Sequence, residues 1–392
     1  MNLAGICAEY NPFHNGHLYH LNKTKEHLSC DGIVCVMSGA FTQRCAPAVF
    51  NKETRAYSAV ANGADLVVEL PFIFSTASAE MFAFGAVSIL EAIGVKWMSF
   101  GSESGKIASL YKALEAVNDP AVDEVIKTEI KRGITFPSAR ANAVKAIYGE
   151  DIFNVLSLPN NILGIEYLKA IKKLNSTITP FTIARTDNGY HSGEPSGKYM
   201  GASAIRELIY TGGKYAHYVP EELHPIYLQS RTADFSYLDR AFLAKLRTVS
   251  PSDINDIFHL TEGLENRIIK YAGMACSIEE LYALIKTKRY THSKIRRAVL
   301  YSFMGITKDK VCVSPPYIRV LAINKNGAEI LKNLKNTCRL PIINKGAYGY
   351  KLLDGKAKIC FDLENQACIL WGLCTDRLSR GDSDFKYKPI IY

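Results

Sequence analysis

Apolar runs and helix-spaced segments alternate along the first hundred residues. Four continuous apolar runs end at turn residues and predict buried strands at residues 3–8, 32–37, 65–70 and 95–100. Three segments with apolar positions at helical spacing separate them, at residues 17–27, 51–62 and 77–93. Strands that alternate with helices across short turns predict βαβ units, and therefore a Rossmann-like α/β fold with a parallel sheet.

Ligands of such sheets bind beyond the carboxyl ends of the strands. In this chain those ends lead into residues 10–17, 38–44, 71–75 and 101–104, which we expect to face one crevice. The periodicity therefore locates a binding site before any motif is considered.

Beyond residue 100 the pattern continues to a Gly-Gly pair. Residues 106–150 are charged and helical and resemble an insertion or a cap. Residues 189–198 form a polar, Gly-rich segment typical of a mobile loop. The remaining predictions are a helix at 162–174, a strand at 180–185 and a helix start at 200–210. Gly212-Gly213 is the predicted boundary between an α/β domain, residues 1–212, and a second region.

The second region, residues 213–392, is helix-rich with an α(+β) end. Its predicted helices cover residues 238–248, 253–257, 262–273, 278–286, 293–305 and 326–333. Its predicted strands cover residues 318–323 and 358–361.

Charge is distributed unevenly between the two parts. Residues 1–212 hold 19 Lys and Arg against 20 Asp and Glu, whereas residues 213–392 hold 28 against 18. A basic second region favours a polyanionic partner, with nucleic acid first among the candidates. A basic solvated surface is the alternative that charge alone leaves open.

The cysteine pattern and the chain start favour a cytoplasmic protein. The ten cysteines form no paired CxxC motifs, and the first residues show no basic segment followed by a cleavage site. The sequence contains no apolar run of about 18 residues, so no membrane-spanning helix is predicted. Cys360, Cys368 and Cys374 are possible metal ligands, but we expect buried thiols and no resident metal site.

The strongest chemical signal is His14-Asn15-Gly16-His17, which follows the first predicted strand and opens a helix. A helix start presents unpaired N–H groups and partial positive charge, and so binds phosphate. Two imidazoles three residues apart can stabilise charge on a phosphoryl group during transfer. We therefore predict His14 and His17 as catalytic residues; a chance match or a metal-ligand pair is the alternative.

A second phosphate-binding element is predicted in the helix start at residues 200–210. Ser203 can donate a hydrogen bond to phosphate, and Arg206 can clamp it with two N–H groups. A helix cap with a surface charge explains the same residues.

These two elements together resemble the HxGH nucleotidylyltransferase superfamily. Gly201-Ala202 stands where that superfamily usually has two serines, and the lysine-rich signature of the related aminoacyl-tRNA synthetases is absent.

A longer set of motifs resembles a narrower family, the bacterial tRNA(Met) cytidine acetate ligases. The motifs are residues 8–17, 37–39, 41–44, 51–52, 55, 63–71, 100–103 and 159–167.

That resemblance implies a two-step reaction. Acetate attacks the α-phosphate of ATP to give acetyl-adenylate and pyrophosphate, and N4 of the wobble cytidine (position 34) of elongator tRNA(Met) then takes the acetyl group. Mg²⁺ normally accompanies the pyrophosphate. By the family pattern the ATP-binding residues are Cys7, Ala8, Glu9, Tyr10, Asn11, Pro12, Phe13, His14, Asn15, Gly16, His17, Leu18, Tyr19, His20, Gly101, Asn160 and Arg185.

Other polar residues near these motifs have looser assignments. Arg44, Lys52 and Arg55 are candidates for meeting anions, and Glu69 and Glu103 for orienting Mg²⁺ or a histidine.

The densest basic stretch, residues 286–297, is the predicted RNA-binding element. Basic residues interleaved with Tyr290 and His292 suit phosphate contact with base stacking. The predicted phosphate contacts are Lys286, Lys288, Arg289, Lys294, Arg296 and Arg297. A solvated helix face is the alternative.

Two other functions compete with the ligase. One is a small-metabolite nucleotidylyltransferase that releases pyrophosphate, and the other is an RNA-binding module with a degenerate nucleotide fold. The basic second region counts against the first, and the intact His14 and His17 pair counts against the second.

Overall fold

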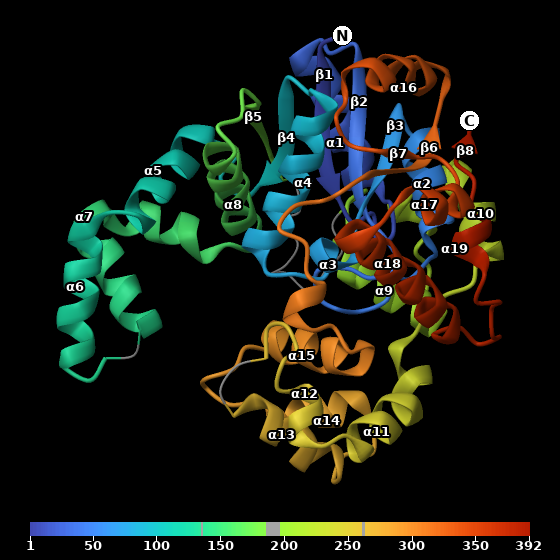
Figure 1. Cartoon of the computed structure of the whole chain (residues 1–392). Coiled ribbons are helices and arrows are strands. Elements are labelled where there is room, and N and C mark those ends of the chain that lie inside the picture. The colour runs from blue at the N-terminus through green and yellow to red at the C-terminus, as the bar shows by residue number, and fades with distance from the viewer. Residues whose placement is uncertain (135, 186–196, 261–262) are drawn as a thin grey trace.

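A single eight-stranded sheet runs through the computed structural model, which describes residues 1–134, 136–185, 197–260 and 263–392 (Figure 1). The strand order is β5-β4-β1-β2-β3-β6-β7, and β8 pairs with β6. The strands are β1 Leu3–Ala8, β2 Gly32–Ser38, β3 Leu66–Leu70, β4 Trp97–Ser102, β5 Thr179–Ala184, β6 Ile318–Ile323, β7 Ile342–Ile343 and β8 Ile390–Ile391.

The five strands of the first half are parallel, as the periodicity predicts. Their register pairs Ala8 with Met37, Ser38 with Leu70, and Ser102 with Ala184, so the carboxyl ends of neighbouring strands lie along one edge. The segments predicted to face one crevice therefore leave the sheet at the same edge.

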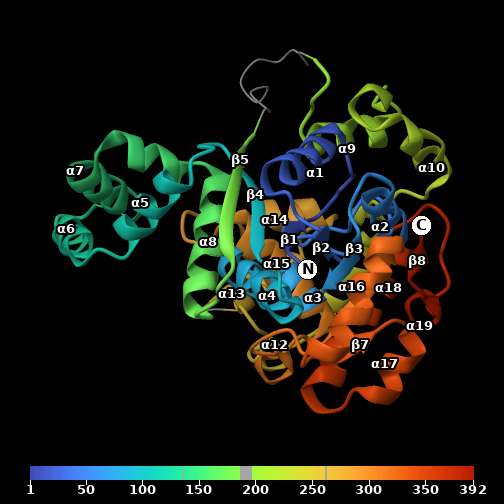
Figure 2. The same ribbon diagram turned by 90° about the horizontal axis from the view of Figure 1, so that it is seen from above.

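Helices cover both faces of this sheet (Figure 2). The helices of the first half are α1 Asn15–Leu28, α2 Lys52–Ala61, α3 Phe72–Ser75, α4 Ala79–Ile93, α5 Ile107–Val117, α6 Pro120–Lys131, α7 Phe136–Ser157, α8 Pro159–Lys173 and α9 Ala202–Thr211. Buried side chains of α1, α2 and α9 form one apolar core, and those of α4 and α8 belong to the other. Helices α5 to α7 project from the body as an arm, which agrees with a predicted insertion (Figure 1).

The second half forms a helical lobe and then returns to the sheet. Its helices are α10 His224–Gln229, α11 Asp239–Thr248, α12 Pro251–Ile254, α13 Leu264–Ala272, α14 Ile278–Ile285, α15 His292–Met304, α16 Lys325–Thr337, α17 Gly346–Leu352, α18 Gly355–Leu373 and α19 Ser383–Lys386. Helices α11 to α15 lie together below the sheet in Figure 1.

Two sequence-based expectations need correction. Residues 358–361 are not a strand, because they lie inside helix α18. The sheet is also not wholly parallel, since β6 runs antiparallel to β3 with Glu69 opposite Arg319.

The boundary at 212–213 stays a prediction, but the second region supplies three strands to the sheet of the first. The Gly-rich segment 189–198 lies largely outside the described residues.

Among the described residues, no helix is long and apolar enough to cross a membrane.

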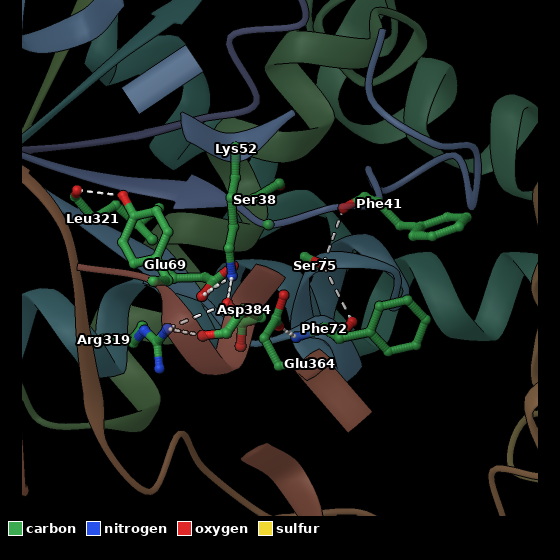
Figure 3. Close-up of polar contacts among 12 residues, drawn as sticks. Ser38, Phe41, Lys52, Glu69, Phe72, Ser75, Arg319, Leu321, Glu364 and Asp384 are labelled. Carbon is green, nitrogen blue, oxygen red and sulfur yellow. Dashed lines mark hydrogen bonds and ion pairs between the residues drawn. The ribbon is translucent and has the colours of Figure 1, made fainter. Parts of the chain in front are cut away.

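A buried charge cluster joins the two halves beneath the carboxyl ends of β2 and β3 (Figure 3). Lys52 Nζ lies 2.8 Å from Glu69 Oε1 and 2.5 Å from Asp384 Oδ1. Arg319 Nη2 donates to the same oxygen of Asp384, at 3.2 Å from Oδ1. All four side chains are almost fully buried. Two cations thus balance two carboxylates that come from segments more than 250 residues apart in sequence.

A fifth member, Glu364, adds a buried carboxyl whose surroundings favour its protonated form. Its Oε2 accepts from the Phe72 N–H at 2.7 Å. Burial, and then the carboxylate of Glu69, raise the pKa of Glu364 well above its usual range. The protonated Glu364 can donate to Glu69. A Cβ on Gly39 would lie 2.4 Å from Glu364 Oε1 and 2.5 Å from Glu69 Oε1, so only glycine fits beside this carboxyl pair.

Glu364→Gln should change stability in a pH-dependent way. In the unfolded chain this carboxyl ionises near its ordinary pKa of about 4.3. In the folded chain it stays protonated at higher pH, so its contribution to stability is complete below the unfolded pKa and is lost as pH rises towards the folded pKa. Glutamine does not titrate and can still donate to Glu69. Urea denaturation should therefore favour the variant more at pH 8 than at pH 5.

Lys52→Met is the contrasting variant, because it leaves the buried Glu69 without its cation, and Asp384 with Arg319 alone. It should cost about 3–5 kcal/mol of unfolding free energy. Lys386→Met, at an exposed ion pair, should leave stability nearly unchanged.

For Glu364→Gln, an equal loss of stability at pH 5 and pH 8 would contradict a protonated Glu364.

Candidate active site

The turn between β1 and α1 ends on His14, which caps the helix with its own side chain. His14 has extended backbone angles, and its Nδ1 accepts from the Gly16 N–H at 3.0 Å. His17, in the first turn, reciprocates: its Nδ1 accepts from the His14 N–H at 3.2 Å. The two rings lie with centroids 3.8 Å apart. The predicted catalytic pair is therefore brought together, in the form of a capping box built from imidazoles.

This arrangement fixes the tautomer of both rings. A ring nitrogen that accepts a hydrogen bond carries no proton, so each neutral imidazole has its proton on Nε2. Burial lowers the pKa of His17 well below its usual range, and the nearby His14 and Arg185 lower it further. His17 is thus a neutral donor at physiological pH, and its hydrogen bond within the described chain is made through Nδ1 rather than Nε2.

Aromatic packing holds the turn in place before the helix. Tyr10 is almost fully buried, with its ring centroid 5.0 Å from that of Phe13 and 4.9 Å from that of His17. Its backbone has a φ of 46°, and its hydroxyl lies 3.3 Å from Cys35 Sγ. The Phe13 carbonyl accepts from the Tyr227 hydroxyl at 3.1 Å. The second region therefore contacts the motif directly.

Polar bonds hold the strand end that precedes this turn. Asn11 Oδ1 accepts from the Val49 N–H at 2.7 Å, and Glu9 Oε1 accepts from the Gln43 N–H at 2.8 Å. Arg55 is fully buried and donates to the carbonyls of Glu9, Ser38 and Gly39. The expectation that Arg55 and Lys52 meet anions is wrong, because both cations are buried in internal contacts.

Gly101 and Arg185 lie on neighbouring strand ends beside the motif. A Cβ on Gly101 would be 3.3 Å from Arg185 Cγ, so the absent side chain leaves room next to the arginine. Arg185 Nη1 lies 3.3 Å from Asn160 Oδ1. These three predicted ATP-binding residues are thus brought together.

Glu103 explains how Asn160 is held. Its Oε1 accepts from the Asn160 backbone N–H at 3.1 Å and from its Nδ2 at 2.7 Å, and its Oε2 accepts from the Asn161 N–H at 2.8 Å. The bond to Nδ2 leaves Oδ1 of Asn160 directed to Arg185. Asn160 is the second residue of α8 and not its cap.

The helix start predicted as a second phosphate element also reaches the motif. Arg206 Nη1 donates to the Asn11 carbonyl at 2.7 Å, and its Nη2 donates to Ser203 Oγ at 3.1 Å. Asn15 Nδ2 donates to the carbonyls of Lys198 and His217, each at 3.0 Å. Helix α9 and the residues on both sides of it therefore contact the N-terminus of α1.

The remaining predicted ATP-binding residues are neighbours of these. Burial raises the pKa of the Cys7 thiol to about 12, with a smaller opposing effect from Tyr167. Ala8 and Leu18 pack against the core that contains Tyr10 and Phe13. The Tyr19 ring meets that of Tyr199, with centroids 6.0 Å apart. Pro12 follows Asn11 through a cis peptide bond.

Sequence patterns did not reveal the partners of these residues. Ser99, at 2.9 Å from His20 Nε2, and Tyr227 come from segments that no motif marked. Ser99 stands two residues before Gly101 on the same strand, so strand alternation was the one signal that pointed to it.

The basic stretch predicted to bind RNA is only partly a surface. Lys286, Lys288 and Arg289 are exposed, and Lys294 and Arg296 are half-buried beside Tyr290 and Tyr282. Arg297 is 7% exposed and donates to the carbonyls of Thr76 and Ala77, at 2.7 and 2.6 Å. Tyr290 is 4% exposed. Arg297 and Tyr290 therefore cannot contact RNA as expected, because folding buries both.

No group of three or more His, Cys, Asp or Glu that could hold a metal ion occurs among the described residues. Glu69 and Glu103, the candidates for orienting Mg²⁺, are occupied by Lys52 and by the start of α8. Cys360 and Cys374 are buried and Cys368 is half-buried. Cys360 lies beside Tyr317.

Comparisons with known proteins agree with this geometry. The model of the HIGH Nucleotidyl Transferase family matches residues 1–382. A tRNA(Met) cytidine acetate ligase of Clostridium perfringens is 39% identical over 411 aligned residues, and one of Thermoanaerobacter is 41% identical over 406; both alignments cover the whole of each chain. The chain belongs to the tRNA(Met) cytidine acetate ligase family. The resemblance drawn from the sequence is thereby confirmed.

A solved structure extends the likeness within this family. The crystal structure of Thermotoga maritima TmcAL bound with alpha-thio ATP matches with a TM-score of 0.89 and 31% identity, covering 100% of this chain and 99% of that chain. The family assignment thus holds for the sequence and for the fold.

Paired substitutions at His17 should separate its capping role from its Nε2 donor. Asparagine can accept from the His14 N–H much as Nδ1 does, whereas alanine cannot. We expect His17→Ala to lose about 1 kcal/mol of unfolding free energy and His17→Asn to lose much less, as measured by urea denaturation. Equal losses in both variants would mean that the imidazole cap contributes nothing.

Proposed function

We propose that this protein is an ATP-dependent acetate ligase for the wobble cytidine of elongator tRNA(Met), acting in the cytoplasm. A carboxylate oxygen of acetate attacks the α-phosphorus of ATP, the bond from that phosphorus to the bridging oxygen breaks, and pyrophosphate leaves. N4 of the cytidine then attacks the acetyl carbon, AMP leaves, and the nitrogen loses a proton. The product is N4-acetylcytidine.

One observation carries the proposal: the histidine capping box at the start of α1. The Nδ1 atoms of His14 and His17 are tied to backbone N–H groups, so each ring carries its proton on Nε2, at a helix N-terminus. Donors fixed in advance stabilise the charge that develops on a phosphoryl group without reorganising during the reaction. We assign transition-state stabilisation to these two rings.

The chemistry needs no protein nucleophile, because acetate supplies the attacking oxygen. Cys7 suits this reading, since burial raises its pKa to about 12 and keeps it an unreactive thiol. The nucleotide lies along Cys7–His20, with Gly101, Asn160 and Arg185 completing its pocket. Ser203 and Arg206 act next to the phosphates, where Arg206 already holds the Asn11 carbonyl.

Mg²⁺ enters this proposal only with ATP, as the metal complex of the substrate. The described residues offer no cluster of metal ligands, and the two nearest carboxylates already have partners. The triphosphate itself supplies the oxygen ligands that Mg²⁺ prefers.

We propose that residues 1–212 carry the catalytic site and that residues 213–392 hold the tRNA. The exposed part of the basic stretch, Lys286, Lys288 and Arg289 with the half-buried Lys294 and Arg296, is the proposed phosphate-contacting face. Arg296 also pairs with Glu279 at 3.3 Å, so it is the weakest member of this set.

The direct test supplies ATP, Mg²⁺, labelled acetate and bulk tRNA to the purified protein. Label should enter elongator tRNA(Met), and pyrophosphate should appear in equal amount. His17→Asn and His17→Ala should both lower acetate-dependent ATP–pyrophosphate exchange by about 10²-fold or more, because both lack the Nε2 donor. Release of pyrophosphate with another acceptor, and none of the label in tRNA, would favour a small-metabolite nucleotidylyltransferase instead.

The basic face is tested by charge reversal. Lys288→Glu with Arg289→Glu should weaken tRNA binding and reduce the slope of its salt dependence by about one unit for each phosphate that the variant no longer neutralises. Lys335→Glu, on α16 at the opposite end of the molecule in Figure 1, is the matched control. Filter binding at low and at physiological salt concentration measures both. Equal affinities for the double variant and the control would place the tRNA elsewhere.

A further inference from the structure

His20 is a further histidine on α1, and a chain of hydroxyl groups engages one of its nitrogens. His20 Nε2 lies 2.9 Å from Ser99 Oγ. Ser99 Oγ lies 2.7 Å from Thr24 Oγ1, and Thr24 Oγ1 donates to the His20 carbonyl at 2.8 Å. The chain begins and ends on the same residue, and it links α1 to the middle of β4.

The direction of every hydrogen bond in this chain follows from its last member. A carbonyl only accepts, so the Thr24 hydroxyl uses its proton on the His20 carbonyl. Thr24 must then accept from Ser99, and Ser99 must accept from His20 Nε2. The proton of His20 is therefore on Nε2, and Nδ1 is an acceptor. Within the described part of the chain the ring is hydrogen-bonded through Nε2 and not through Nδ1, and the side chain is only half-buried.

His20 keeps this acceptor character at physiological pH. Burial, with a further contribution from the Arg185 charge, lowers the pKa of His20 to about 4. The ring is therefore neutral above about pH 5. A nitrogen of such low basicity is a poor general base, which leaves hydrogen-bond acceptance as its role.

The position of His20 places this acceptor beside the proposed nucleotide pocket. Ser99 stands two residues before Gly101 on β4, so both lie on the same face of the strand. Gly101 borders Arg185, and the positive charge of Arg185 also lowers the pKa of His20. His20 follows His17 by three residues on α1, about one helical turn from the catalytic ring.

We propose that His20 Nδ1 accepts a hydrogen bond from a donor group on the adenosine of ATP, and so helps to select the nucleoside. This inference rests on ATP binding at the site proposed above. The phosphates of ATP and the carboxylate of acetate are acceptors, so neither can pair with Nδ1. The hydroxyls of the ribose and the 6-amino group of the base are the donors that ATP offers.

Equilibrium binding without tRNA tests the proposal, because the cytidine amine is then absent. The probes are ATP, 2′-deoxy-ATP, 3′-deoxy-ATP and purine riboside triphosphate, which lacks the 6-amino group. The variants are His20→Gln, whose amide can still donate to Ser99 but offers no acceptor at the Nδ1 position, and His20→Asn, whose amide oxygen can replace Nδ1. Lys23→Gln, on an exposed part of α1, is the control.

One of the three analogues should bind the unaltered protein about tenfold more weakly than ATP, because it leaves Nδ1 unpaired. His20→Gln should bind ATP about as weakly as the unaltered protein binds that analogue. The variant should also no longer distinguish that analogue from ATP. His20→Asn should recover part of the distinction, and Lys23→Gln should retain all of it. The affected analogue identifies the donor as a ribose hydroxyl or the base amine.

Two outcomes separate failure of this inference from failure of the proposed function. If the unaltered protein does not bind ATP, the proposed function fails. If it binds ATP but His20→Gln weakens ATP and all three analogues by the same factor, His20 has only a structural role and the inference is overturned.

Discussion

Two hydrogen bonds at the start of α1 are the interactions on which the proposed catalytic site depends: Gly16 N–H donates to His14 Nδ1, and His14 N–H donates to His17 Nδ1. They use one nitrogen of each ring to satisfy the unpaired N–H groups at the start of α1, and this use dictates where the remaining protons lie. Helix capping and catalytic preorganisation are therefore one event: the turn cannot fold in this way without placing the ring protons on Nε2. His20 follows the same logic through Ser99 and Thr24, but there the hydroxyl chain takes the Nε2 proton and leaves an acceptor.

The turn between β1 and α1 is held by parts of the chain that lie far from it in sequence. Tyr227 donates to the Phe13 carbonyl, and Arg206 donates to that of Asn11. Beneath the sheet edge, Lys52 pairs with Asp384, while Arg55, three residues later on α2, holds the carbonyl of Glu9. The C-terminal segments thus support α2, and α2 supports the strand end that leads into the motif. The proposed boundary at residue 212 follows a change in composition, but residues on both sides of it hold this turn in place.

The sequence predicted the parallel half of the fold and brought the candidate site residues to one sheet edge, because both follow from local signals. Periodicity placed β1 and β6 at their observed bounds, and the predicted strand–turn–helix context of His14 is the one observed. Residues 358–361 were misassigned because their apolar positions, read over four residues, fit a strand as well as the helix that contains them. Arg297 and Tyr290 looked like an RNA-binding surface because composition carries charge but not burial. The antiparallel pairing of β3 with β6, and with it the Lys52 cluster, depends on contacts across some 250 residues that no periodicity encodes.

The protonation state of His14, His17 and His20 is the central claim, and nitrogen-15 NMR of imidazole-labelled protein measures it most directly. Long-range ¹⁵N–¹H spectra at pH 7, with His14, His17 and His20 assigned by single substitution, report which ring nitrogen carries a proton. The hydrogen-bond geometry predicts that His14, His17 and His20 are neutral and protonated on Nε2, with Nδ1 unprotonated. A charged ring at His17, or a proton on Nδ1 of His14 or His17, would contradict the account, because that nitrogen could not then cap the helix.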